Sequence, residues 1–372
     1  MNVCFLANIP DSDGVGHIVV EIDDFMRRLF LKEIDATKKY VLIRKSRRIS
    51  REFTRLYKHK FDLAVCSSFL YYLTLPLIIR YADIRLDCGL SRTKWHKLNS
   101  ADEVKSEKLS EWPKTITKHK NLSEWEDRYR RRVESPYFTP LRDFRKSDDR
   151  LDQFLAGSDK IALIHLKTNI SNATAKQTDS STYIPTIEAL ITQKYQLVFA
   201  GREKMPELFK NYDIFNYAES KLSSFTNDII LFNRADLAIM GGSGIFLLAE
   251  CLNIPLLYIN YWHLYRLPAT SSSICVPALV QDLSGRLLTF SDQWNLYKNA
   301  DDAKSEVFPF DRYEARNATA DEILKACQEL IEIKRNNTEL TALQKKFNNA
   351  SDYYFGESRI SDYFIQQHKD LL

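Results

Sequence analysis

Residues 235–255 read Ala-Asp-Leu-Ala-Ile-Met-Gly-Gly-Ser-Gly-Ile-Phe-Leu-Leu-Ala-Glu-Cys-Leu-Asn-Ile-Pro. An apolar run stops at the glycine-rich turn 241–244, a helix-like segment begins directly after it, and a second apolar run, 256–260, follows the proline. This order predicts a strand, a tight turn, a helix and another strand, which is the βαβ unit of a parallel sheet. Backbone N–H groups at such a helix N-terminus can bind an anion, and Ser243 adds a hydroxyl there. The alternative is a plain turn in which glycine serves only the backbone conformation.

Length and composition indicate a folded protein with two domains. The chain has 372 residues, of which 44% are hydrophobic and 27% charged, so each half can bury a core of its own. The net charge of +4 is mild, and we expect no nucleic-acid partner. Basic clusters at 44–55 and 128–132 are interpreted as solvated helix faces. The alternative for both is an electrostatic contact with anionic lipid or with a charged acceptor.

The six cysteines show no metal-ligand spacing, and several lie in apolar runs, which is typical of a reducing compartment. The chain starts directly with a predicted strand, so no signal peptide is expected. The longest apolar run, 69–79, is too short to span a bilayer. These features predict a cytoplasmic protein.

Strands and helices alternate along both halves of the chain, which predicts an α/β fold with two tandem Rossmann-like domains and a cleft between them. The first domain, 1–150, ends in a polar helical excursion at 91–150. The second, 151–340, is followed by a helical tail, 341–372, which is expected to pack back on the first domain. The predicted strands are 2–7, 40–44, 62–66, 84–87, 160–165, 196–200, 213–217, 236–240 and 256–260.

Three predicted helices have clear sequence signals. The first has one apolar face. The second, 182–194, joins two predicted strands. The third begins at a capping box formed by Thr319 and Glu322. The apolar face of the first helix comprises Ile18, Ile22, Phe25, Met26, Leu29 and Phe30.

A glycine-rich loop that ends in Gly16 and His17 follows the first predicted strand. Glycine lets a ligand approach the backbone, and a histidine at a helix N-terminus is favoured in its neutral, basic form. Glu21 lies one turn further on, and Asp13 lies in the loop. The alternative is a capping loop with a structural histidine. Asp11-Ser12-Asp13 matches a DxD motif formally, yet we expect no metal and metal-independent chemistry.

Three predicted strands of the second domain end in residues that suit an anionic ligand. His165 and Lys167 follow one strand, and Arg202 follows the next. Cations at strand ends can bind a diphosphate. Gly242, Ser243 and Gly244 add the turn described above. Each feature alone has a structural alternative, but together they predict a nucleotide-diphosphate site at one edge of the sheet.

These motifs resemble those of GT-B glycosyltransferases, and most closely a bacterial family of surface-polysaccharide glycosyltransferases. The resemblance is strongest over 155–262, with a short island at 14–30. The chain has Lys167 where the family has arginine, and it lacks the glycine before Pro255. Where the family has an Arg-Asn pair, this chain reads Asp-Ser-Ser at 179–181. Better-studied GT-B enzymes carry a ribose-binding glutamate at the positions of Leu247 and Leu248, so Glu250 is not assigned that role.

The resemblance implies a GT-B-type glycosyltransferase of polysaccharide synthesis. No prosthetic group is expected, and the co-substrate would be a nucleotide-sugar donor. Ser243, Gly244, His165, Lys167 and Arg202 would hold its diphosphate. A glycan or lipid-linked acceptor would enter near Gly16 and His17, with His17 as base and Asp13 or Glu21 as alternatives.

The resemblance also implies peripheral contact with the inner face of the membrane or with other synthesis enzymes. Two other functions stay open at this point. One is a nucleotide-sugar epimerase or hydrolase on the same fold, and the other is a non-catalytic subunit that binds a glycan or a nucleotide.

Overall fold

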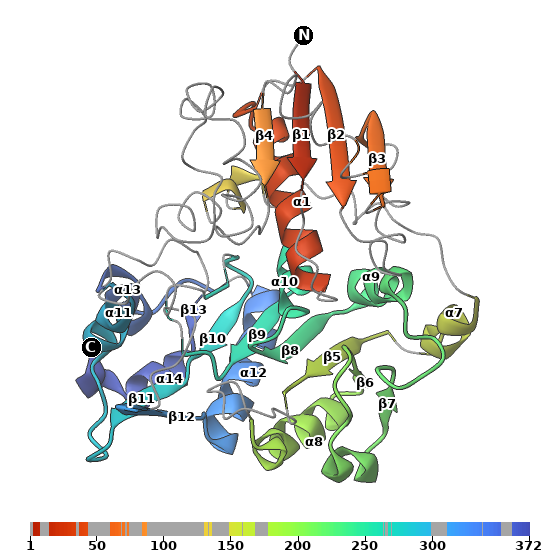
Figure 1. The fold of residues 1–372 in the computed structure, drawn as a ribbon. Coiled ribbons are helices and arrows are strands. Elements are labelled where there is room, and N and C mark those ends of the chain that lie inside the picture. The colour runs from red at the N-terminus through yellow and green to blue at the C-terminus, as the bar shows by residue number, and fades with distance from the viewer. Residues whose placement is uncertain are drawn as a thin grey trace. The chain divides into compact units, whose positions relative to one another are not determined.

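A computed structural model of the protein describes residues 3–7, 15–34, 37–43, 60–67, 69–70, 73, 84–87, 130–132, 134–135, 149–157, 159–167, 178–262, 264, 267–268, 270–298, 311–336, 338–350 and 359–372. The chain divides into two compact units (Figure 1). Unit 1 comprises 1–131 and 138–144, and unit 2 comprises 132–137 and 145–372.

Unit 1 contains a four-stranded parallel sheet in the order β3-β2-β1-β4 (Figure 1). β1 lies in the middle and pairs with β2 and β4, as expected where a chain adds parallel strands on both sides of the first one. The elements of this unit are β1 (Val3–Ala7), α1 (Val15–Phe30), β2 (Lys38–Ile43), β3 (Leu63–Cys66) and β4 (Ile84–Asp87).

Helix α1 buries a face that carries charges as well as apolar side chains. Ile22, Phe25 and Met26 are buried, as the apolar pattern predicts, and Val19 is buried as well. Phe30, which the same pattern assigns to the buried face, is 53% exposed. The buried face also includes Arg27, whose guanidinium bonds to a carboxylate one helical turn earlier. The period of the helix is therefore predicted correctly, but the extent of its buried face is not.

Unit 2 contains a seven-stranded sheet in the order β13-β10-β9-β8-β5-β6-β7, with every pair parallel. The central strands β5, β8 and β9 are buried along their whole length, which explains why they read as continuous apolar runs. The α/β class and the parallel sheet are thus confirmed. The strands are β5 (Ile161–His165), β6 (Gln196–Phe199), β7 (Ile214–Asn216), β8 (Leu237–Gly241), β9 (Leu256–Ile259), β10 (Ile274–Val276) and β13 (Arg359–Ile360).

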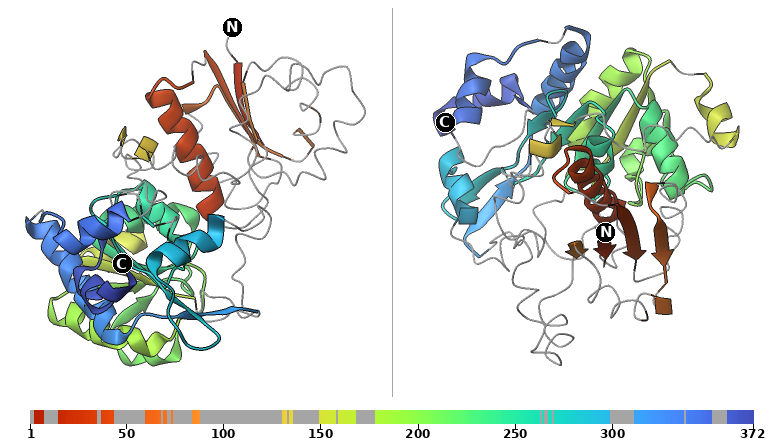
Figure 2. Two further views of the ribbon diagram at one scale, coloured as in Figure 1. Left: turned by 90° about the vertical axis from the view of Figure 1, so that its left-hand side faces the viewer. Right: turned by 90° about the horizontal axis from the view of Figure 1, so that it is seen from above.

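Helices cover both faces of this sheet. In the strand order, β6 lies on one side of β5, and β9 lies on the opposite side of β8. Because both connections are right-handed crossovers, the helix between β5 and β6 and the helix between β8 and β9 lie on opposite faces of the sheet. α12 packs against α8 on one face, and α9 contacts α10 on the other (Figures 1 and 2). These helices are α8 (Ile184–Thr192), α9 (Phe225–Arg234), α10 (Phe246–Cys251) and α12 (Ala320–Asn336).

Local sequence signals account for several of these boundaries. The predicted helix 182–194 is a 3-10 turn, η5 (Ser180–Tyr183), followed by α8, which has a proline in its first turn. The capping box that begins α12 is present, since the backbone N–H of Thr319 donates to Glu322 and the backbone N–H of Glu322 donates to the Thr319 hydroxyl.

The region after residue 271 contains short elements that the sequence does not reveal. β10 and β13 extend the sheet, and β11 pairs with β12 as a separate antiparallel ribbon. The predicted helical tail thus also contributes a strand, β13, to the sheet of unit 2. Its packing on the first domain and the predicted domain boundaries stay predictions. The remaining elements are α7 (Asp149–Leu155), η6 (Glu207–Asn211), β11 (Leu279–Asp282), α11 (Phe290–Lys298), β12 (Tyr313–Arg316), α13 (Ala342–Asn349), α14 (Asp362–Gln367) and η8 (Lys369–Leu371).

Candidate functional site

The candidate site lies at the carboxyl edge of the seven-stranded sheet in unit 2. β8, β5 and β6 are neighbours, and because they are parallel, the residues that follow them emerge at the same edge. These residues are Lys167 after β5, Arg202 after β6 and Ser243 after β8. Ligands of open α/β sheets bind at this edge. The structure therefore brings the strand ends together as the sequence predicts.

His165, the last residue of β5, is a buried and neutral imidazole. Its Nδ1 lies 2.9 Å from the carbonyl oxygen of Ala200, which can only accept, so Nδ1 carries the proton. Burial, opposed by the Ala200 carbonyl and assisted by the charge of Lys167, lowers the pKa of His165 to about 4. Its Nε2 is buried and has no hydrogen-bond partner among the described residues. His165 can therefore accept a hydrogen bond at Nε2, but it supplies no positive charge at neutral pH.

Gly201 makes room for this imidazole. A Cβ atom at residue 201 would lie 2.5 Å from Nδ1 of His165, well inside van der Waals contact. The φ angle of Gly201 is +101°, a conformation that side-chain-bearing residues rarely adopt. Gly201, directly after β6 and Ala200, therefore leaves the space that the His165 ring occupies.

Lys167 and Arg202 follow neighbouring strands. Lys167 is half-buried, and its carbonyl oxygen accepts a hydrogen bond from the backbone N–H of Thr178 at 3.1 Å. Arg202 is exposed. Both side chains therefore bring positive charge to the same edge of the sheet, which suits an anionic ligand.

The turn after β8 holds a buried hydroxyl. The backbone N–H of Ser243 donates to the carbonyl of Gly241 at 2.8 Å, which fixes the turn. The Oγ atom of Ser243 is buried and has no hydrogen-bond partner among the described residues. Gly242 is buried and Gly244 is exposed. An unpartnered buried hydroxyl is costly, and a bound ligand would relieve that cost.

The helix after this turn starts later than the sequence predicts. α10 begins at Phe246, two residues beyond Gly244, and it is six residues long. The side chain of its N-cap residue, Ile245, makes no hydrogen bond to the backbone of the helix. A helix this short has a weak dipole, so the Ser243 hydroxyl is the stronger candidate for binding a ligand at this turn.

Two polar residues at this edge were missed by the sequence analysis. Asn260, directly after β9, has a φ of +58°, and its Nδ2 donates to the Thr178 hydroxyl at 3.4 Å. Its Oδ1 accepts from the backbone N–H of Ala318 at 2.7 Å. Asparagine tolerates the left-handed region better than most residues that carry a side chain. An asparagine at the end of an apolar run could therefore have indicated a turn at the end of this strand.

Glu250, in α10, is buried and forms an ion pair with Arg132. Its carboxylate is therefore engaged with a cation of the protein. This agrees with leaving Glu250 out of the ribose-binding role in the sequence analysis.

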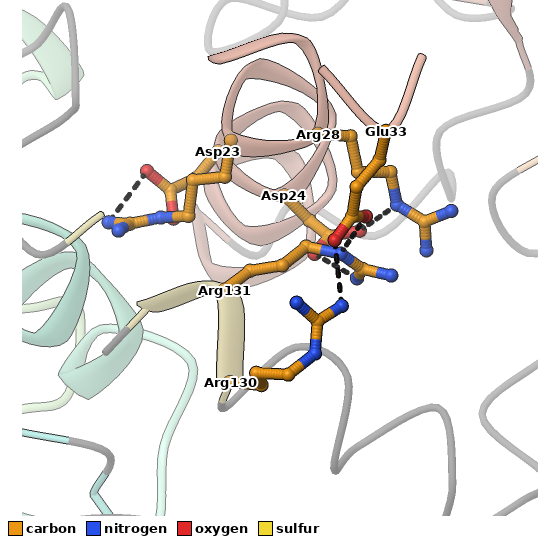
Figure 3. A network of polar contacts seen from close by, with 7 residues as sticks. Asp23, Asp24, Arg28, Glu33, Arg130 and Arg131 are labelled. Atoms are coloured by element: carbon orange, nitrogen blue, oxygen red, sulfur yellow. Dashed lines mark hydrogen bonds and ion pairs between the residues drawn. The ribbon is translucent and has the colours of Figure 1, made fainter. Parts of the chain in front are cut away.

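The interpretation of the basic cluster at 128–132 as a solvated helix face is wrong for two of its residues. Arg131 is 3% exposed and Arg132 is 6% exposed. Within unit 1, Arg131 bonds Asp24 at 2.8 Å and Glu33 at 2.7 Å (Figure 3). Arg130 bonds the other oxygen of Glu33, also at 2.7 Å. Partners about a hundred positions away along the chain are invisible to a local charge pattern. The cluster at 44–55 lies outside the described residues.

The candidate acceptor-side residues are placed only in part. Gly16 and His17 lie in the first turn of α1, and Glu21 lies one turn later on the same helix. The side chains of His17 and Glu21, and the whole of Asp13, lie outside the described residues. Their roles stay predictions.

The described part of the chain lacks two features. No helix among the described residues is long and apolar enough to cross a membrane. No group of three or more His, Cys, Asp or Glu side chains among them is arranged to hold a metal ion.

Comparisons with known proteins give a fold but no sequence family. No family model and no curated protein matches the sequence. The structure is similar to that of a glycosyl transferase family 9 protein from Veillonella parvula DSM 2008, with a TM-score of 0.54 at 10% identity over 89% of this chain and 97% of the other.

Two further solved structures match at lower scores. The E. coli heptosyltransferase WaaC with ADP has a TM-score of 0.40 at 12% identity, over 74% of this chain and 91% of that one. A UDP-N-acetylglucosamine 2-epimerase described as putative, from Listeria monocytogenes, has a TM-score of 0.35 at 8% identity, over 69% of this chain and 79% of that one. Because the likeness to the Veillonella parvula protein extends over most of both chains, this chain has the fold of the GT-B glycosyltransferases, and the likeness concerns the fold alone.

Proposed function

We propose that this protein is a glycosyltransferase that moves a sugar from a nucleotide-activated donor to a glycan or a lipid-linked acceptor. The observation that carries the proposal is the buried hydroxyl of Ser243, which has no hydrogen-bond partner among the described residues. It lies at the carboxyl edge of the seven-stranded sheet, where Lys167 and Arg202 also emerge. The GT-B fold supports it, since a glycosyl transferase family 9 protein has a similar fold. In this proposal residues 151–340 bind the donor and residues 1–150 bind the acceptor.

The donor site would bind a nucleotide diphosphate through a hydroxyl group, two cationic side chains and a neutral imidazole. The Ser243 hydroxyl would donate to a phosphate oxygen, and Lys167 and Arg202 would offset the negative charge of the leaving group. His165 is neutral, so its Nε2 would accept from a hydroxyl or N–H of the ligand. The sequence predicts that His165 helps to hold the diphosphate, and this proposal makes its role that of a hydrogen-bond acceptor.

In the transfer step, an acceptor hydroxyl oxygen would attack the anomeric carbon of the donor sugar. The bond from that carbon to the diphosphate would break, and the nucleoside diphosphate would leave with the bonding electron pair. A base takes the proton of the acceptor hydroxyl, and we assign this role to His17, with Asp13 or Glu21 as alternatives. No metal is invoked, because Lys167 and Arg202 would stabilise the leaving group. A cytoplasmic location and peripheral contact with the membrane or with other synthesis enzymes are retained as part of the proposal.

The donor site is tested by nucleotide binding. A thermal-shift screen with UDP-, GDP-, CMP- and dTDP-linked sugars identifies the donor, since a ligand that binds the folded state raises its apparent stability. Calorimetry then compares the wild type with Ser243→Ala and Lys167→Ala, each expected to weaken binding about tenfold. Ser291→Ala and Lys325→Ala, which change exposed residues of α11 and α12, are the matched controls. Unaltered affinity in both site variants would place the anion site elsewhere.

The reaction class is tested with His17→Ala. The proposal expects lost transfer with retained donor binding. Unchanged turnover would remove His17 from the role of base. An epimerised or hydrolysed nucleotide sugar formed without any acceptor would favour the epimerase or hydrolase alternative. Binding without turnover in the wild type would favour a non-catalytic subunit.

A further inference from the structure

Glu250 is a buried carboxylate that pairs with a residue from a distant part of the sequence. Its side chain is 1% exposed, and the side chain of Arg132 that pairs with it is 7% exposed. Both residues belong to unit 2, although 118 positions separate them along the chain. Burying a charge is costly, and the pairing of this carboxylate with this guanidinium offsets part of that cost for both groups.

This ion pair acts on a short helix whose buried residues are Phe246, Leu248, Ala249, Glu250 and Cys251. α10 is six residues long and has no side-chain N-cap, so helical propensity contributes little to its placement. Its apolar side chains pack on the sheet, for example Phe246 against Tyr258 with ring centroids 4.5 Å apart. Apolar contacts of this kind resist a shift of the helix but are non-directional. A charge-assisted hydrogen bond is directional and restricts that movement.

The position of α10 is transmitted to the turn that precedes it. The backbone N–H of Phe246 donates to the carbonyl of Ser243 at 3.3 Å, and that of Leu248 donates to the carbonyl of Ile245 at 3.0 Å. These bonds tie the first turn of the helix to residues 243–245. A rotation of α10 would therefore move the unpartnered Ser243 hydroxyl.

We propose that the Arg132–Glu250 ion pair holds α10 so that the Ser243 hydroxyl faces the ligand, which makes Arg132 and Glu250 positioning residues for the donor site. The inference rests on the proposed function for the identity of the ligand. It assigns Glu250 a role within the protein and no contact with the donor. It also gives Arg132 a role in positioning the donor site.

The test compares Arg132→Met with the wild type by two independent measurements. Hydrogen exchange of the amides of 241–251 reports on the placement of α10 without any ligand. Calorimetry with UDP, GDP and dTDP reports on the donor site. We expect faster exchange over 241–251 and about tenfold weaker binding of the nucleotide that the wild type binds. Arg132→Lys keeps the positive charge but lacks the planar guanidinium group of arginine. We expect its exchange rate over 241–251 and its nucleotide affinity to lie between those of Arg132→Met and the wild type.

Arg131→Met is the matched control. It removes a neighbouring buried arginine whose partners, Asp24 and Glu33, lie in unit 1. Exchange over 241–251 should stay at the wild-type rate in this variant. If Arg132→Met does not fold, the comparison of Arg132→Lys with the wild type decides, since slower or unchanged exchange over 241–251 would contradict the proposal.

The two proposals fail in different ways. Wild-type exchange rates over 241–251 in folded Arg132→Met would overturn the positioning role, whatever the protein binds. A wild type that binds none of the three nucleotides would count against the proposed function, while faster exchange in Arg132→Met would still support the positioning of α10.

Discussion

The imidazole of His165 occupies the space that a side chain at residue 201 would fill. A Cβ atom at Gly201 would lie 2.5 Å from Nδ1 of His165 and 2.8 Å from its Cε1. The ring also hydrogen-bonds the carbonyl of Ala200, so two consecutive residues after β6 fix one buried histidine at the end of β5. A single methyl group added at residue 201 would therefore displace His165 at the edge of the sheet.

Gly201→Ala is expected to destabilise the protein and to displace His165. Alanine at a φ of +101° is strained, at a cost of about 1–3 kcal/mol, and the ring must also move away from the new methyl group. Urea denaturation measures the loss of stability, and nucleotide calorimetry measures the effect on the site. Gly285→Ala is the matched control, since residue 285 has a φ of +86° but a Cβ atom there would have no described neighbour within 4 Å. Equal losses in both variants would show that the contact with His165 adds nothing.

The buried His165 predicts a dependence of stability on pH. Its pKa is about 4 in the folded state and about 6.5 when unfolded, so between these values the unfolded state binds more protons. The contribution of neutral His165 is therefore complete above pH 6.5 and is lost as the pH falls towards 4. We expect the free energy of unfolding to fall by about 2–3 kcal/mol from this group between pH 7.5 and 4.5.

Carboxylates titrate over part of the same range, so His165→Gln provides the reference. The difference in unfolding free energy between wild type and His165→Gln should shrink, or change sign, as the pH is lowered. A difference that stays constant from pH 7.5 to 4.5 would contradict a lowered pKa at His165.

Asp23→Asn is expected to be strongly destabilising. The Arg27 Nε atom bonds Asp23 at 2.6 Å, and both side chains are at most 2% exposed. Neutralising the carboxylate removes one partner of a buried ion pair, which costs about 3–5 kcal/mol. The measurement is the urea midpoint of unfolding. Asp62→Asn, which breaks the exposed pair with Lys38, should have little effect on that midpoint, and a similar effect from the two variants would argue against burial as the cause.

Thr319→Ala is expected to shorten or weaken α12. The Thr319 hydroxyl accepts from the backbone N–H of Glu322 at 3.3 Å and donates to the Glu322 carboxylate at 2.9 Å. Loss of this cap costs about 1 kcal/mol of stability. Thr319→Ser keeps the hydroxyl and should stay close to the wild type in thermal unfolding. An alanine variant as stable as the serine variant would show that the cap contributes nothing.

The sequence predicts every strand of the two parallel sheets except β10 and β13, and most of the predicted strands contain a short apolar run. β4 is predicted at its observed bounds, and β5 and β8 lie within one residue of theirs. β10 and β13 are missed because they are three and two residues long, too short to show a period. They form strands because β9 presents an edge for β10 and β10 then presents one for β13, a cause that lies in the tertiary structure.

The candidate site is predictable where its residues follow strands directly. Ser243, His165 and Arg202 are found in this way, because the edge of a parallel sheet gathers whatever follows the strands. Partners that depend on contacts across the chain are not predictable. Arg132 pairs with Glu250 across 118 positions, and no local pattern distinguishes it from an arginine on a solvated face.

β13 covers the edge of the seven-stranded sheet that β10 would otherwise present. Arg359 and Ser361 donate their backbone N–H groups to the carbonyls of Ser273 and Cys275, which occupies the outer side of β10. Every residue of β10 is apolar and buried. In a chain cut before residue 359, this strand would be an open apolar edge, and such edges recruit strands from other copies. Residues 359–372 therefore act against aggregation, so shortened versions of the protein are expected to form oligomers at concentrations at which the full chain does not.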